Sequence, residues 1–290
     1  MINAVQSVYS FSTEIIITNT VKECDKIFQE LLELDIEHKI TLNEYLWDGS
    51  FSNARNFGID KARYDWIFVI DSDEVIDKPI KNLDPFYDYY FVKIENFKNM
   101  FYDSIRIFKP GIRYRYNVHE SLEEVCVNKK GCRSDAIIRH NGYNDNNLLS
   151  KAERNFNLML KDYDNPVRNY HLAQYYFTKK KMYKALKHAL KVLSDEVNEA
   201  HKANICNLIY MITGNVMYLI DSIKYVSNQI TARILLVNEL IEKQNYILAS
   251  DNLFVLSEIN EKKNSDIPNE IYLTNEFLNN KRKEITKWIH

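Results

Sequence analysis

The sequence predicts an α/β domain over residues 1–145, followed by an all-helical domain over residues 146–290. In the first half, short apolar runs typical of buried strands alternate with segments of helical periodicity. That order favours a parallel sheet with right-handed crossovers. After Tyr143 the composition changes: the polar stretch at residues 144–147 indicates a linker, and only helical patterns follow it.

Taken in order, the elements of the first half are as follows. Residues 2–9 fit a short helix or an irregular lead-in equally well. We expect helices at residues 21–34 and from residue 51, and strands at residues 14–18, 38–42, 66–70, 89–94 and 104–108. Ser50 or Ser52 is a suitable N-cap for the second helix. The unbroken apolar run at residues 66–70 is typical of a central parallel strand that is covered on both faces.

An acidic cluster follows that run directly, at Asp71, Asp73 and Glu74. Ligands of open α/β sheets bind at the carboxyl ends of the strands. Two carboxylates at positions i and i+2 of such a turn can share one divalent cation and leave coordination positions for phosphate oxygens and water. The alternative is structural: Ser72 or Asp73 caps a short helix that begins near Glu74.

The surrounding residues resemble a known family. The run from Trp47 to Gly58 reads WDGSFSNARNFG, and the run from Asp65 to Val75 reads DWIFVIDSDEV. In this order the two runs resemble the inverting glycosyltransferases of family 2, which have the GT-A fold and a D-x-D motif at this strand end. The resemblance implies a Rossmann-like GT-A domain, a nucleoside diphosphate sugar as donor, and Mn²⁺ or Mg²⁺ as cofactor.

The chain departs from the family near its beginning. Members usually start with one more strand, which contacts the base of the donor nucleotide, and here Met1 falls where the following helix is expected. The acidic turn expected after the next strand reads NTVKECD at residues 19–25. Three explanations stay open: the start is placed too late, a partner supplies the strand, or the donor is not an ordinary nucleotide sugar.

Further segments resemble the same family: Arg106 to Phe108, Val118 to Glu120, and Ile138 to Tyr143. The resemblance implies a set of donor-binding residues, namely Arg55, Asn56, Asp71 and Arg106. Arg106, Arg113 and Arg115 either line an anionic pocket or form a solvated strand face.

A histidine beside a glutamate suggests two further roles at His119 and Glu120. His119 is the predicted third metal ligand beside Asp71 and Asp73, because an imidazole nitrogen suits manganese. Glu120 is the predicted catalytic base that takes the proton of the acceptor. The non-functional alternatives are that Glu120 is a surface carboxylate and that His119 and His140 have structural roles.

The second half carries the pattern of helical repeats. Residues 151–160 open it with a helix, and residues 169–193 resemble a tetratricopeptide helix pair. A shift of about 34 residues leads to a second apolar pair, and a third pair at residues 235–256 is out of strict register. Trp288 is expected to seal the last pair. Such repeats form surfaces for peptides or for a second subunit, so a peptide or protein acceptor and a homodimer through this domain are expectations.

Composition and charge argue against some classes of function. The formal net charge of −2 argues against a general nucleic-acid binder. No apolar run approaches the length of a membrane helix, and the beginning of the chain does not resemble a secretory leader, so we expect a cytoplasmic protein without a membrane span. The four cysteines lack zinc-like spacing and are expected as free thiols.

Three functional hypotheses result. The first is a metal-dependent inverting glycosyltransferase that acts on a peptide, protein or saccharide; within the resemblance, the S-glycosyltransferases of bacteriocin peptides combine the same two domains. The second is a catalytically degenerate relative that works as a protein-binding module through its repeats. The third is a truncated reading frame.

Overall fold

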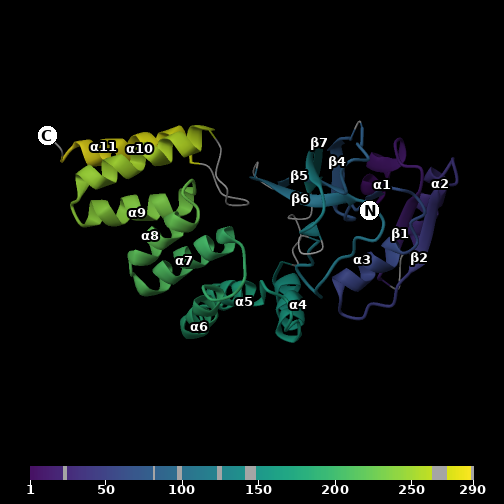
Figure 1. Ribbon diagram of the computed structural model, residues 1–290, viewed down its shortest axis with the longest axis horizontal. Coiled ribbons are helices and arrows are strands. Elements are labelled where there is room, and N and C mark those ends of the chain that lie inside the picture. The colour runs from purple at the N-terminus through teal and green to yellow at the C-terminus, as the bar shows by residue number, and fades with distance from the viewer. Residues whose placement is uncertain are drawn as a thin grey trace. The chain divides into compact units, whose positions relative to one another are not determined.

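The structure is a computed structural model that describes residues 1–290 except 22–24, 81, 97–99, 123–125, 141–147, 263–272 and 289–290. The chain forms two compact units, Met1–Asp164 and Asn165–His290 (Figure 1). The first unit contains sheets and helices and the second contains helices, so the predicted coarse layout is confirmed. The predicted linker at residues 144–147 lies outside the described residues.

The division between the units falls later than the predicted boundary at residues 145 and 146. Helix α4 (Leu148–Lys161) belongs to the first unit. The guanidinium of Arg154 on α4 lies 5.0 Å from the ring centre of Phe51, and Asp162 accepts a hydrogen bond of 2.9 Å from the backbone N–H of Asn117. These contacts attach α4 to the sheet-containing part of the chain.

The first unit begins with four elements that alternate between helix and strand and continues with a helix and five strands. They are α1 (Ile2–Tyr9), β1 (Ile15–Asn19), α2 (Asp25–Leu34), β2 (Ile40–Glu44), α3 (Phe51–Ile59), β3 (Ile67–Phe68), β4 (Glu74–Lys78), β5 (Tyr89–Asn96), β6 (Met100–Phe108) and β7 (Gly131–His140). Residues 2–9 are therefore helical, and Ser50 is the N-cap of α3, since its side chain accepts a hydrogen bond from the N–H of Asn53.

The strands form two sheets. β1 and β2 pair in parallel, and the larger sheet has the order β3-β6-β5-β7-β4, in which only β5 and β7 are parallel. The predicted central parallel strand at residues 66–70 was therefore wrong. Only Ile67 and Phe68 are in strand conformation, and β3 is an edge strand paired antiparallel to β6.

Burial explains why these residues are nevertheless apolar. Ile67 belongs to one hydrophobic cluster of the large sheet, and Trp66 packs against a second cluster, in which its ring lies 5.5 Å from that of Tyr90. Phe68 and Ile70 also pack against the cluster that contains α1 and β1. The apolar run thus indicates side chains that are covered on several sides. A sequence pattern cannot distinguish this burial from that of a central parallel strand.

The acidic cluster does not start a helix. Glu74 is the first residue of β4, which pairs antiparallel to β7 with Glu74 opposite His140. The helix-cap alternative for Ser72 and Asp73 is therefore wrong. Helix α3 approaches the small sheet closely at Gly58, where an added Cβ would lie 2.6 Å from the Thr18 hydroxyl oxygen.

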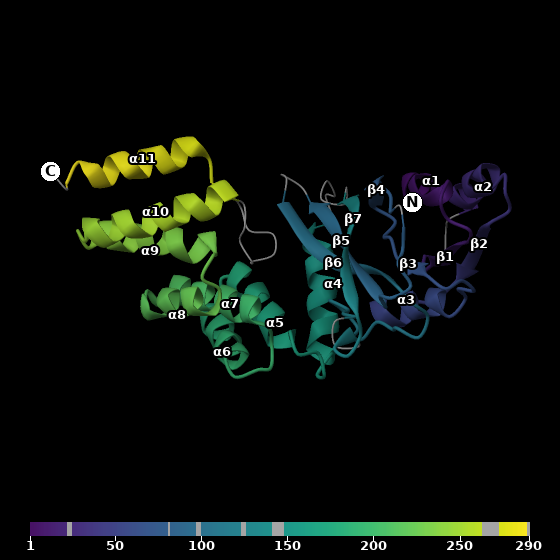
Figure 2. The same cartoon turned by 45° about the horizontal axis from the view of Figure 1, so that its top comes forward.

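The second unit is built from helix hairpins (Figure 2). Its helices are α5 (Arg168–Thr178), α6 (Met182–Val192), α7 (Glu199–Thr213), α8 (Met217–Tyr225), α9 (Ile230–Glu242), α10 (Tyr246–Lys262) and α11 (Asn275–Thr286). The turns of the hairpins α5–α6, α7–α8 and α9–α10 each hold a residue with positive φ, at Lys180, Gly214 and Gln244. Gly214 follows Lys180 by 34 residues, and Gln244 follows after 30, so the period is kept once and then shortened.

The structure also bears on the expectations for Trp288, for the cysteines and for membrane helices. The ring of Trp288 stacks on Tyr246 at the start of α10, with centroids 5.9 Å apart. Cys126, Cys132 and Cys206 are free thiols, and Cys24 lies outside the described residues. Among the helices that the structure describes, none combines the length and the apolar character needed to cross a bilayer.

A buried carboxylate joins the first elements of the chain. Asp35 accepts hydrogen bonds from the Tyr9 hydroxyl (3.2 Å) and from the N–H groups of Lys39 (2.8 Å) and Ile40 (3.0 Å). Burial raises the pKa of Asp35, but these hydrogen bonds outweigh that effect and hold the pKa below its ordinary value. A carboxyl group with a lowered pKa stabilises the fold above its unfolded pKa of about 4, and this contribution is lost as the pH falls through the folded value.

We therefore expect Asp35→Asn to lower the free energy of unfolding by about 1 kcal/mol at pH 7, since an amide cannot accept all three hydrogen bonds. Below about pH 4 the difference from the unmodified protein should shrink. Urea titrations followed by the fluorescence of Trp47 and Trp66, both in the first unit, measure it. Asp60→Asn, at an exposed carboxylate, is the control. An equal loss of stability at both pH values would contradict the role of the Asp35 charge.

Candidate functional site

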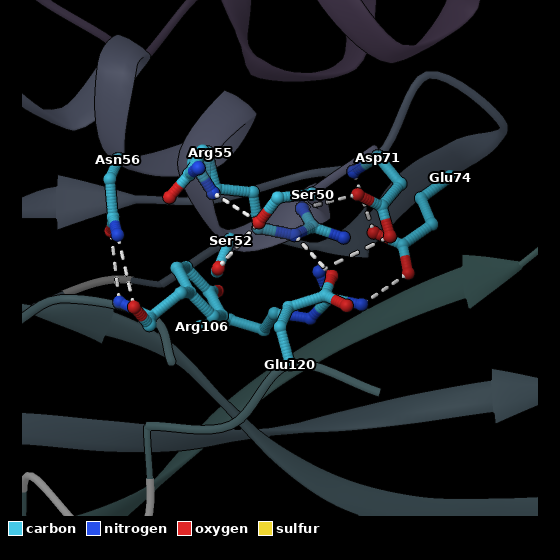
Figure 3. Close-up of polar contacts among 10 residues, drawn as sticks. Ser50, Ser52, Arg55, Asn56, Asp71, Glu74, Arg106 and Glu120 are labelled. Carbon is cyan, nitrogen blue, oxygen red and sulfur yellow. Dashed lines mark hydrogen bonds and ion pairs between the residues drawn. The ribbon is translucent and has the colours of Figure 1, made fainter. Parts of the chain in front are cut away.

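A group of charged side chains meets beyond the end of β3 (Figure 3). Helix α3, strand β6 and the start of β4 each contribute, as does the loop closed by the isolated bridge between Arg115 and Ser121, which holds Glu120. The charged group, called the β3 cluster below, consists of Arg55, Asp71, Glu74, Arg106 and Glu120. Apart from Asp71 and Glu74, these residues are far apart in the sequence, so the fold creates the cluster.

Arg55 on α3 connects two carboxylates. Its Nη1 lies 2.6 Å from Asp71 Oδ1, and its Nε lies 2.6 Å from Glu120 Oε1. The guanidinium also lies 5.3 Å from the ring centre of Tyr114, a cation–π distance. The planar group with several N–H donors is suited to this bridging role, because one guanidinium can satisfy two carboxylates in fixed directions.

Arg106 on β6 forms the buried half of the cluster. Its Nη2 lies 2.6 Å from Glu74 Oε1, and its Nη1 lies 3.6 Å from Asp71 Oδ2. Glu74 also accepts a hydrogen bond of 2.8 Å from the backbone N–H of Asp71. The side chains of Glu74 and Arg106 are 1% and 8% exposed, so this ion pair is shielded from water.

Asp71 therefore lies between two guanidinium groups. Burial alone raises the pKa of Asp71, but the charges of Arg55 and Arg106 outweigh that effect and hold this pKa well below its usual range. For Glu74, burial raises the pKa, and Arg106 opposes the rise only in part. Asp71 is thus a carboxylate at every working pH, and its negative charge is shared between two cationic partners.

A second, more exposed pair lies beside the cluster. His140 Nε2, at the end of β7, is 3.5 Å from Asp73 Oδ2, and the Asp73 side chain is 42% exposed. The hydrogen bond between them lowers the pKa of Asp73 and raises the pKa of His140. The pairing of β4 with β7 causes this contact, since Glu74 lies opposite His140 in the register.

The structure places the other predicted site residues differently. Asn56 donates to the Tyr114 carbonyl and accepts from the Tyr114 N–H, both at 2.9 Å, so its side chain holds that backbone segment. His119 is exposed and has a positive φ of 52°. The contacts of the described residues bring His140 to Asp73, and none of them joins His119 to Asp73 or Asp71. Within the same residues, no group of three or more His, Cys, Asp or Glu side chains is arranged to hold a metal ion.

Of Arg106, Arg113 and Arg115, the three arginines considered for an anionic pocket, the described contacts bring Arg106 alone to the cluster. Arg113 pairs with Asp60 at the surface, and Arg115 is exposed. Sequence reasoning gave Glu74 no functional or ion-pairing role. The sequence does contain a sign of this ion pair: Arg106 is a single charge between two isoleucines of an apolar strand. A charge that is buried in this way requires a partner of opposite charge.

Comparison with known proteins adds no relative to this picture. No protein-family model matches the chain, and no curated protein is significantly similar to it.

Proposed function

We propose that the chain is a glycosyltransferase that moves a sugar from a nucleoside diphosphate donor to an acceptor with inversion at the anomeric carbon. The observation that carries the proposal is the pair of guanidinium groups on Asp71 beyond the end of β3, with Asp73 and His140 beside them. Arg55 is the more exposed of the two guanidinium groups, and a fixed cation next to the exposed carboxylate of Asp73 suits a diphosphate group and the cation that accompanies it.

The metal fits best at the exposed pair. Asp73 offers a carboxylate oxygen and His140 an imidazole nitrogen, a donor set that suits Mn²⁺, while Mg²⁺ needs only one or two carboxylates besides phosphate oxygens and water. When bound, the cation would act as a Lewis acid that stabilises negative charge on the diphosphate. Asp71, which is held by two arginines, would orient Arg55 and Arg106 instead of binding the metal.

Glu120 is the proposed catalytic base. One of its oxygens accepts from Arg55, and the other makes no hydrogen bond among the described residues. In the proposed step, an acceptor hydroxyl or thiol forms a bond to the anomeric carbon while the bond from that carbon to the phosphate oxygen breaks. The bonding electrons leave with the diphosphate, and the acceptor proton passes to Glu120. Arg55, which contacts both Glu120 and Asp71, would keep the base and the diphosphate site in a fixed relation.

The acceptor class rests on the sequence resemblance alone. A peptide or protein is proposed before a saccharide, because helix hairpins of this kind offer extended surfaces for polypeptides. A homodimer through the helical unit is proposed on the same ground.

A second candidate is a catalytically inactive, protein-binding relative. It is favoured by the short β3, which pairs on one side with β6 and leaves the β1–β2 sheet separate. In this case the β3 cluster would be a structural ion-pair network, and partners would bind the helical unit.

Calorimetric titration of the chain with uridine and guanosine diphosphates, with and without Mn²⁺, tests the proposal. We expect binding that depends on the metal and becomes at least about 10-fold weaker in Asp73→Asn, because one ligand of the cation is lost. Asp77→Asn is the matched control, since Asp77 is an exposed carboxylate on the same chain segment that pairs with Arg139. An absence of binding under every condition would leave the second candidate. Binding that is equal in both variants would place the nucleotide site elsewhere.

A further inference from the structure

Helix α6 has an outer side on which lysines and apolar residues are mixed. Five of these side chains follow one another at spacings of one or three residues, which places them on one face of the helix. We call this the α6 outer face, and it consists of Tyr183, Lys184, Lys187, Leu190 and Lys191. On the opposite side, Ala185, Ala189 and Val192 are fully buried, so the helix is clearly amphipathic in its packing. Within the helical unit, α5 and α6 lie at the end away from α11 (Figures 1 and 2).

This part of the chain has a charge of one sign. Residues 165–194 contain no Asp or Glu, whereas the whole chain has a net charge of −2. The basic residues in this stretch are Arg168, Lys179, Lys180, Lys181, Lys184, Lys187 and Lys191. Its six lysines are all exposed. The first carboxylate after the stretch, Asp195, accepts a hydrogen bond from Asn169.

The three lysines of the α6 outer face have no carboxylate partner in the part of the chain that the structure describes: no ion pair joins Lys184, Lys187 or Lys191 to an Asp or Glu. The positive charge also acts on His188 of the same helix. Burial lowers the pKa of His188, and the charges of Lys191 and Arg168 lower this pKa further. A surface with several exposed lysines and no carboxylate between residues 165 and 194 attracts anionic partners.

Apolar side chains protrude from the same surface. Tyr183 is 82% exposed and Leu190 is 46% exposed, and Met182 at the start of α6 is 41% exposed. Any partner that occupies this surface must therefore accept aliphatic and aromatic groups as well as lysine charges.

We propose that the α6 outer face docks on the surface of an anionic lipid bilayer. Clusters of four to eight basic residues on an amphipathic helix are attracted to anionic headgroups, and exposed Tyr and Leu side chains can enter the boundary between headgroups and acyl chains. Nucleic acid would neutralise the lysines but would offer no place for Leu190 and Met182. The cores of protein interfaces are depleted in lysine. The proposal does not depend on the proposed transferase activity.

Flotation of the full chain with vesicles tests this proposal. We expect binding to vesicles made of equal parts of phosphatidylcholine and phosphatidylglycerol, and none to phosphatidylcholine alone. Replacing Lys184, Lys187 and Lys191 together by Gln should weaken binding on the order of 100-fold, since each lysine near an anionic surface contributes about a fivefold change. Tyr183→Ala with Leu190→Ala should remove the part of the binding that persists when the salt concentration is raised.

The control removes the same charge elsewhere. The control variant carries Lys224→Gln, Lys262→Gln and Lys283→Gln, on α8, α10 and α11. These three lysines are not part of the α6 outer face, so this triple variant should bind like the unmodified protein. Two results would overturn the proposal: no binding to the anionic vesicles, or equal binding of both triple variants. Single-stranded DNA and polyglutamate are the competing ligands. If the protein binds single-stranded DNA or polyglutamate but no vesicles, the α6 outer face is a site for that class of partner instead.

Discussion

Glu74→Ala should lower the free energy of unfolding of the first unit by about 3–5 kcal/mol, the range for breaking a buried ion pair on one side. The reason is the position of Arg106, whose side chain is 8% exposed and whose Nη2 lies 2.6 Å from Glu74. The substitution leaves this guanidinium with only the longer contact to Asp71, at 3.6 Å, and it also removes the acceptor of the Asp71 N–H. Urea denaturation followed by the fluorescence of Trp47 and Trp66 measures the loss.

Two further variants show whether the charge or the packing matters. Replacing both Glu74 and Arg106 by Met should cost far less than Glu74→Ala, because no buried charge remains without a partner. Asp77→Ala removes a carboxylate from the same strand, β4, but its partner Arg139 is 52% exposed, so the cost should stay within about 1 kcal/mol. Equal losses in Glu74→Ala and Asp77→Ala would show that the Glu74–Arg106 pair does not stabilise the fold.

The same residues show how far the sequence predicts this fold. The periodicity of apolar residues placed α2, α3, β1, β2, β5 and β6 close to their observed positions, because it reports which side chains are buried, but it predicted no strand at β4 or β7. It did not predict the partner of each strand. Residues 66–70 are covered on several sides, as a central strand would be, yet β3 pairs only with β6, some 40 residues later in the chain. Pairing depends on where distant segments fold back, and a local pattern does not contain that information.

The candidate site shows the same limit at the level of side chains. Arg55, Asp71, Arg106 and Glu120 were predicted as site residues, and the structure brings all of them together. The sequence favoured His119 as the ligand beside Asp73, whereas the histidine that contacts Asp73 in the structure is His140, because β4 and β7 pair with Glu74 opposite His140. The strand register that brings His140 to Asp73 cannot be seen in a local sequence pattern.

Arg55→Lys is the sharpest test of how the β3 cluster would serve the proposed function. Arg55 contacts Asp71 and Glu120 at 2.6 Å each through different nitrogens, whereas the single ammonium of lysine cannot hold both carboxylates in these directions. Loss of one such charge-assisted contact is worth about 1.5–3 kcal/mol, so we expect the affinity for a nucleoside diphosphate with Mn²⁺ to fall by about 10-fold to 100-fold. Calorimetric titration measures this change.

The control is an arginine of the same unit outside the cluster. Arg113→Lys should leave the nucleotide affinity unchanged, since Arg113 pairs with Asp60 at the surface. If Arg55→Lys binds the nucleotide as tightly as Arg113→Lys does, the bridge from Asp71 to Glu120 has no part in donor binding. If both variants keep their fold and only Arg55→Lys loses affinity, the effect arises from the geometry of the guanidinium, because both substitutions preserve the positive charge.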